Sequence, residues 1–247
     1  MRTFLILWKR ELAAYFLSPI AYVMMMFFLA VMGYTFWMLL NILAHGVVGA
    51  TVMNELFGSI FFWITLLILI PLITMRLLAE ENRSGTIELL MTAPVTEAQV
   101  VLAKYAGALS FYFIMWMPTL AYVYVLRRYD PLMSVDLGPL AAGYLGALLL
   151  GAFYLSAGLL MSALTRNQIV AAMSAFAMVT LAFFAGFMPY ISRSETVRDA
   201  GRNFSAVMHM MDFSRGMVDT RPAVLYLTGA AFLLFTTVKI LEMKKWK

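Results

Sequence analysis

The chain has 247 residues, of which 63% are hydrophobic and 13% are charged, and its mean hydropathy is +0.86. A soluble domain carries about twice that share of charged residues, so the composition excludes an ordinary soluble domain. The net charge of +5 does not indicate nucleic-acid binding, because the cations lie at the ends of apolar runs, where anionic headgroups attract them. The absence of cysteine excludes disulfides, thiolate metal sites and cysteine nucleophiles.

The first 18 residues differ from the rest of the chain, because charged and apolar side chains alternate there. The apolar ones fall near helical spacing, at Leu5, Trp8, Leu12 and Tyr15. This pattern is typical of a helix that lies in the membrane interface rather than crossing it. The apolar run before Lys9 is too short for the core of a cleavable signal peptide. Pro19 suits a break before the next helix.

Six apolar runs follow, each long enough to cross a hydrocarbon core of about 30 Å as a helix. They cover Ile20–Leu43, Leu56–Leu78, Tyr105–Leu126, Leu140–Leu164, Gln168–Ile191 and Ala223–Leu241. Lipid offers no partners to backbone groups, so these spans must be helical. Pro71 and Pro118 lie late in their spans and can bend them without any special function. We therefore predict an all-α membrane protein with six transmembrane helices and one N-terminal interfacial helix, in a single domain over residues 1–247.

The placement of arginine and lysine predicts the orientation of these spans. With the N-terminus inside, 11 of the 18 cations lie in inner segments and 7 in outer ones, and every lysine is inside. The bias is moderate because the outer loop at 192–222 is itself basic. We expect both termini, and the connection at 79–98, to face the cytoplasm.

The connection at 79–98 is a short charged stretch between two long apolar spans. Ser84 can cap a short helix, with Glu88 near its first turn, and Pro94 ends it. Two interpretations remain open from these residues alone. The segment is either a docking surface for a soluble partner or a helix lying on the lipid headgroups.

The fourth span carries small residues at four-residue spacing, namely Gly143, Ala147 and Gly151, with a further pair at Gly158 and Ser162. Small side chains at this spacing allow another helix to approach closely. Such a face either packs within one subunit, or forms a surface that slides during transport or joins two subunits.

The outer loop at 192–222 is too long for a simple connection. Its apolar stripe at i, i+3, i+4 and i+7 consists of Phe204, Val207, Met208 and Met211, and Gly216 is placed to end that helix. The helix either rests on the outer membrane surface or forms a re-entrant or capping element. Asp212, Arg215, Asp219 and Arg221 are expected to be solvated charges.

The sequence contains no pattern for catalysis. It has no G-x-x-x-x-G-K-[ST] phosphate loop and no G-x-S-x-G nucleophile motif. His45 and His209 lack metal-ligand spacing, and His209 is expected to be an interfacial side chain. We therefore predict no catalytic residue, no metal site and no cofactor on this chain. The interiors of the spans hold essentially no ionisable residue, which argues against an ion-coupled transporter and places the energy source outside the bilayer.

The stretch LLAEENRSGTIELLMTAPVT resembles the cytoplasmic loop of ABC-2 type transporter permeases, whose pattern is roughly A-E-E-(K/R/N)-x-x-G-T-(I/L/M)-E-x-L-x-x-(T/S)-P. The interfacial helix, the six spans, the long outer loop and the basic tail agree with that family. The resemblance implies that this loop contacts a separate ATPase, through Glu80, Glu81, Asn82, Arg83, Ser84, Gly85, Thr86, Glu88 and Pro94. At the fourth position of this pattern, Asn82 stands where many members have lysine or arginine.

Within the family, HMMDFSRGMVDTRPAVLYL at 209–227 is similar to the gliding-associated permease branch, through Phe213, Arg215, Gly216 and Asp219 among others. The nitrous-oxide-reductase maturation permeases are a more distant relative.

The resemblance implies a subunit of a bacterial inner-membrane ABC exporter. Its partners would be two copies of an ATPase that binds ATP and Mg²⁺, a second permease subunit (identical or related), membrane lipid and an accessory protein in the membrane or periplasm. No nucleic acid is expected. The alternative is a scaffold or mechanical transmitter for motility or protein maturation that moves no substrate.

Overall fold

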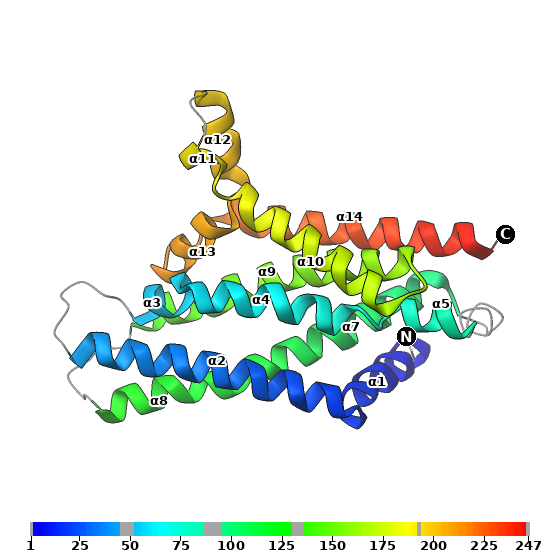
Figure 1. Ribbon diagram of the computed structural model, residues 1–247, viewed down its shortest axis with the longest axis horizontal. Coiled ribbons are helices and arrows are strands. Elements are labelled where there is room, and N and C mark those ends of the chain that lie inside the picture. The colour runs from blue at the N-terminus through cyan, green and yellow to red at the C-terminus, as the bar shows by residue number, and fades with distance from the viewer. Residues whose placement is uncertain (1, 45–51, 86–94, 130–135, 192–193, 246–247) are drawn as a thin grey trace.

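The computed structural model describes residues 2–44, 52–85, 95–129, 136–191 and 194–245, and these ranges contain helices and no strands. Six helical stretches within them are long and apolar enough to cross a membrane. The predicted all-α fold with six spanning helices is confirmed. Most of the helices run along the long axis of the molecule, and α1, α5 and the end of α14 lie at one end, here called the termini end (Figure 1).

The N-terminal helix α1 (Arg2–Leu17) ends before Ser18, and Pro19 begins the first spanning helix α2 (Pro19–Ala44), so the chain breaks where predicted. Proline suits the first helical position because its missing N–H has no intrahelical partner there. α1 packs along α7 rather than lying free. Trp8 Nε1 donates to Ser110 Oγ at 3.1 Å, and the ring of Tyr15 stacks on Phe111 with centroids 4.8 Å apart.

The second predicted span is not one continuous helix. The chain forms α3 (Val52–Gly58) and then α4 (Ile60–Thr74), with a break at Ser59. The Ser59 hydroxyl accepts the backbone N–H of Phe62 at 3.2 Å and so caps α4. Serine competes with the helix backbone for hydrogen bonds and favours caps, which explains why a hydrophobic run of sufficient length is interrupted. After a turn, α5 (Ala79–Ser84) leaves the span at the termini end.

The third span begins earlier than predicted. α7 (Glu97–Trp116) begins two turns before Tyr105, because Thr96 and Gln99 form a reciprocal capping box. Pro118 lies in a 3₁₀ turn, Met117–Thr119, that separates α7 from α8 (Leu120–Tyr129). The proline therefore interrupts this span, as its position predicted.

The fourth span, α9 (Leu137–Leu164), is the centre of the bundle, and 16 of its 28 residues are buried. Side chains from several other helices pack against its small residues. A Cβ at Gly143 would lie 2.6 Å from the Phe57 ring of α3, a Cβ at Gly151 would strike Tyr112 of α7, and one at Gly158 would strike Thr74 of α4. Ala147 is fully buried in the same face. The glycine face therefore packs within one subunit, which was one of the two interpretations.

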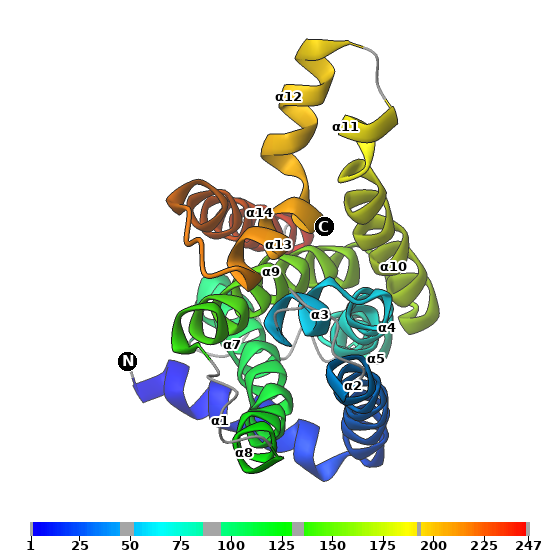
Figure 2. The ribbon, with the colours of Figure 1, turned by 90° about the vertical axis from the view of Figure 1, so that its left-hand side faces the viewer.

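The fifth span, α10 (Gln168–Ala185), ends before the predicted Ile191, and the short α11 (Met188–Ile191) follows. α11 and α12 (Glu195–Phe204) stand away from the bundle (Figure 2). The chain then returns to the bundle in α13 (Ala206–Ser214), and α14 (Thr220–Lys245) forms the sixth span.

The predicted stripe of the outer loop is wrong at its first member. Phe204 is 63% exposed and ends α12, because Ser205 caps a new helix by accepting the Met208 N–H at 3.2 Å. The buried face of α13 consists of Ala206, Val207, His209, Met210, Phe213 and Ser214. Gly216, with a φ of 83°, ends this helix at the predicted place. α13 packs on α9 and α3, and its position relative to the membrane surface stays a prediction.

Candidate functional site

The first turn of α5 is held by a serine of another helix. The N-cap residue before α5, Leu78, has no side chain that can cap the free N–H groups. The hydroxyl of Ser162 on α9 accepts the N–H groups of Leu78 and Ala79 at 3.1 and 3.0 Å, and donates to the Met75 carbonyl at 3.3 Å. One buried hydroxyl therefore fixes the direction in which the chain leaves the second span.

Asn82 faces the ends of two spanning helices. Its Nδ2 donates to the carbonyls of Thr165 and Ala163 at 3.2 and 3.4 Å. Lys244 of α14 donates to Asn82 Oδ1 at 3.3 Å and to the Ala163 carbonyl at 2.7 Å. Asn82 thus joins α5 to the last turns of α9 and α14.

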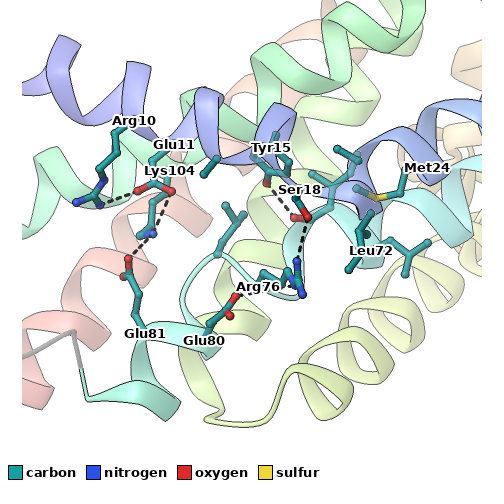
Figure 3. Close-up of a pocket in the computed structure, with 15 residues that line it drawn as sticks. Arg10, Glu11, Tyr15, Ser18, Met24, Leu72, Arg76, Glu80, Glu81 and Lys104 are labelled. Atoms are coloured by element: carbon teal, nitrogen blue, oxygen red, sulfur yellow. Dashed lines mark hydrogen bonds and ion pairs between the residues drawn. The ribbon is translucent and has the colours of Figure 1, made fainter.

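Glu81 also faces inward, toward a buried lysine. Lys104 of α7 is 3% exposed, and its ammonium lies 2.7 Å from Glu81 Oε1 and 3.2 Å from Glu11 Oε2 of α1 (Figure 3). Arg10 pairs with the other oxygen of Glu11 at 2.8 Å. These four residues, the Lys104 cluster, connect α5 to α1 and α7. Removal of one partner from a buried pair of this kind costs about 3–5 kcal/mol.

The remaining residues of α5 form its exposed side. The Glu80 side chain is 54% exposed, and Arg83 and Ser84 are exposed as well. Ser84 is the last residue of the helix, and its hydroxyl donates to the Glu80 carbonyl at 2.9 Å. Gly85 ends the helix with a left-handed φ of 72°, a conformation that favours glycine. Thr86, Glu88 and Pro94, together with the helix predicted after Ser84, lie outside the described residues.

Sequence reasoning missed Lys104, which it counted as a charge in a connection. The signal was present in the run VVLAKYAGAL, where one lysine interrupts apolar residues after the capping box at Thr96. Because α7 begins at Glu97, Lys104 lies on its third turn and inside the bundle. A lysine at such a position requires a carboxylate partner, and the sequence did not indicate which one.

At the end of the bundle opposite the termini, the residues predicted in the outer loop lie in α13 and in the turn between α13 and α14. Phe213 is 1% exposed and packs against Gly146 of α9, and Asp219 caps α14 by accepting the Arg221 N–H at 2.9 Å. Arg215 is exposed, as expected.

His209 is buried rather than interfacial, and its Nδ1 lies 3.0 Å from Tyr226 Oη. Burial lowers the pKa of His209, and the carboxylates of Asp212 and Asp219 oppose that shift.

The described residues contain no group of three or more histidine or carboxylate side chains that could hold a metal ion. Residues 40–235 match the sequence model of the family described as "ABC-2 family transporter protein". This range includes α5, Lys104 and α13. The chain belongs to the ABC-2 transporter family. A search of curated proteins found no match. This ABC-2 permease is therefore a multi-pass, non-catalytic membrane component of an ABC transporter, and family membership implies an ABC ATPase partner.

Proposed function

We propose that this ABC-2 permease couples ATP hydrolysis on a separate ATPase to export across the membrane, and that residues 79–98 are the coupling segment. One observation carries the proposal: side chains and backbone groups of α5 are hydrogen-bonded or ion-paired to α7, α9 and α14, and Lys104 of α7 pairs in turn with Glu11 of α1. A helix of six residues has little stability of its own, so its position is determined by these contacts. A displacement of α5 would therefore be passed directly to three helices, and through Lys104 to α1.

The two sides of α5 have different roles in this proposal. Glu81 and Asn82 already have partners within the chain, so they transmit the movement rather than contact the ATPase. The ATPase would instead contact the exposed Glu80, Arg83 and Ser84, together with the segment 86–94. Two ATPase copies, with ATP and Mg²⁺ bound to them, would act on a pair of permease subunits, either identical or related.

The termini end is proposed to be cytoplasmic and the membrane to be the bacterial inner membrane. The support is the excess of arginine and lysine on that side. The similarity of residues 209–227 to gliding-associated permeases supports that branch, in which an accessory protein would contact the end formed by α11 to α13. For the cargo, the proposal goes no further than a molecule that is exported across the membrane.

Cysteine substitution tests both the docking and the orientation, because the chain has no native cysteine. Ser84→Cys on α5 should cross-link to the co-expressed ATPase and resist an impermeant thiol reagent in intact cells. Ser194→Cys, at the start of α12, is the matched control and should give the opposite result in both assays. Labelling of Ser84→Cys in intact cells would contradict the orientation. Cross-linking from Ser194→Cys but not from Ser84→Cys would contradict the docking site.

A further inference from the structure

A cavity of about 710 Å³ opens between α1, α2, α4, α5 and α7 at the termini end (Figure 3). Its volume lies within the range of small-molecule sites in proteins. The wall is divided in two. Ile20, Ala21, Met24 and Leu72 form an apolar part along α2 and α4. The charged part lies at the helix ends, with Arg76, Glu80 and the Lys104 cluster.

Two polar atoms on this wall are buried without a hydrogen-bond partner among the described residues, Arg76 Nε and Glu81 Oε2. Glu80 lies 3.9 Å from Arg76 Nε, which is too far for a hydrogen bond. Among the described residues, the Arg76 guanidinium makes one long hydrogen bond of 3.4 Å, from Nη1 to Ser18 Oγ. A buried donor and a buried acceptor that both lack partners are costly, and they indicate a ligand that supplies both.

The charges on the wall specify the kind of ligand. Arg10 and Lys104 are neutralised by Glu11 and Glu81. A phosphate would give Arg76 the bidentate acceptor that guanidinium groups prefer. It would also release Glu80 from its weak contact with that arginine. A primary ammonium on the same ligand would then donate to Glu80 and to the free oxygen of Glu81, whereas a quaternary ammonium has no N–H to donate.

We propose that this cavity is a binding site for a phospholipid with a zwitterionic phosphoethanolamine headgroup. The phosphate lies at Arg76, the ammonium lies between Glu80 and Glu81, and the acyl chains follow the apolar wall of α2 and α4. The apolar part of the wall favours a lipid over a soluble phosphoethanolamine compound, which would leave Met24 and Leu72 uncovered. The site belongs to the permease alone and does not depend on the proposed coupling to an ATPase.

Native mass spectrometry of the purified, delipidated chain in detergent tests this site. Phosphatidylethanolamine should bind about tenfold more tightly than phosphatidylglycerol or phosphatidylcholine with the same acyl chains, since one charge-assisted hydrogen bond is worth that factor. Arg76→Gln should weaken phosphatidylethanolamine binding by about tenfold or more. Arg166→Gln removes an exposed cation at the same end of the bundle, outside the cavity, and should leave binding unchanged.

Two further variants keep the test decisive. Glu80→Gln should remove the preference for phosphatidylethanolamine over phosphatidylcholine while leaving Lys104 paired. Ala14→Trp fills the cavity from its α1 wall without removing a charge, and should abolish binding even if Arg76→Gln does not fold.

Three results would overturn the proposal. Equal affinity for the three headgroups would mean non-specific annular lipid. An equal loss in Arg76→Gln and Arg166→Gln would mean a general charge effect. Glycerophosphoethanolamine binding as tightly as the lipid would mean that the ligand is soluble.

Discussion

At the scale of single residues, the proposed coupling segment depends on side chains that its own helix does not supply. Lys104 and Ser162 come from α7 and α9, far from α5 in the sequence, and each satisfies α5 groups that are otherwise buried without partners. Local propensity therefore predicts that a charged segment exists at 79–85, but not which of its residues face inward. Glu80 and Glu81 are adjacent and chemically alike, yet one is half-exposed and the other is paired with a buried lysine.

Substitution of Lys104 tests the Lys104 cluster. Lys104→Met keeps the apolar stem but leaves Glu81 and Glu11 without their cation, so we expect a loss of about 3–5 kcal/mol in stability. Glu81→Gln added to Lys104→Met should recover part of that loss, because one uncompensated charge is removed. The free energies of unfolding in a double-mutant cycle measure the coupling. Strict additivity of the two substitutions would contradict a direct ion pair.

The pKa of His209 gives a pH dependence at the opposite end of the bundle. Burial lowers the pKa in the folded chain, so below about 6.5 the unfolded chain binds a proton that the folded chain does not. The stability contributed by neutral His209 is therefore present above that pH and is lost as the pH falls through it. We expect the melting temperature to fall between pH 7.5 and 5.5, and to fall less in His209→Gln. An identical fall in that variant would assign the pH dependence to other groups.

At the scale of elements, hydropathy predicts that the six spans exist but not where each begins and ends. The predicted fourth span agrees with α9 to within three residues, because its first and last turns are bounded by an Asp136 cap and an extended Thr165. The second and third spans differ because Ser59 and the Thr96–Gln99 pair supply caps inside or beside apolar runs. Caps depend on one or two hydrogen bonds, and a hydropathy average over about 20 residues does not detect them.

The sequence motif predicted part of the candidate site, but not the contacts that hold it in place. The motif predicted a coupling segment at 79–98, and Gly85 ends α5 where the motif has its glycine. The partners of Asn82 were not predictable, because the Ala163 carbonyl and Lys244 are 81 and 162 residues away. Contacts of that separation depend on how the spans pack, and a single sequence does not carry that information.

Ser162→Ala tests whether α9 positions α5. The substitution removes the acceptor of two buried N–H groups, which costs about 1–3 kcal/mol. Amide hydrogen exchange at residues 78–85 should become faster as the first turn of α5 loosens. Ser156→Ala is the matched control, because Ser156 is equally buried on the same helix but donates only to the Phe153 carbonyl. Equal exchange in the two variants would mean that Ser162 is a packing residue without a role in holding α5.

At the scale of the whole molecule, the two ends of the bundle are held together differently. At the termini end, polar groups join α5 to α7, α9 and α14, Lys104 connects α7 to α1, and a cavity separates part of α1 from α4. At the other end, α13 is packed on the glycine face of α9 by Phe213, with a hydrogen bond from Ser214 to Asn54 of α3 at 3.2 Å. In the proposed mechanism, movement that begins at α5 would reach α13 through α9 and α10, because both of these helices contact α5 and α13.

The last prediction separates docking from transmission in the assembled transporter. Arg83→Glu reverses a charge on the exposed side of α5 and should weaken ATPase binding by roughly tenfold or more, provided that the arginine meets a carboxylate in the interface. Lys104→Met leaves that exposed side unchanged, so the ATPase should still be recovered with the permease. ATP turnover in that complex should no longer respond to the permease, because α5 has lost its connection to α1 and α7. Pull-down of the ATPase and its turnover rate, measured at equal expression, distinguish the two effects. If Lys104→Met abolished binding while Arg83→Glu had no effect, the ATPase would contact the inner side of α5, and the division of roles proposed for this helix would be wrong.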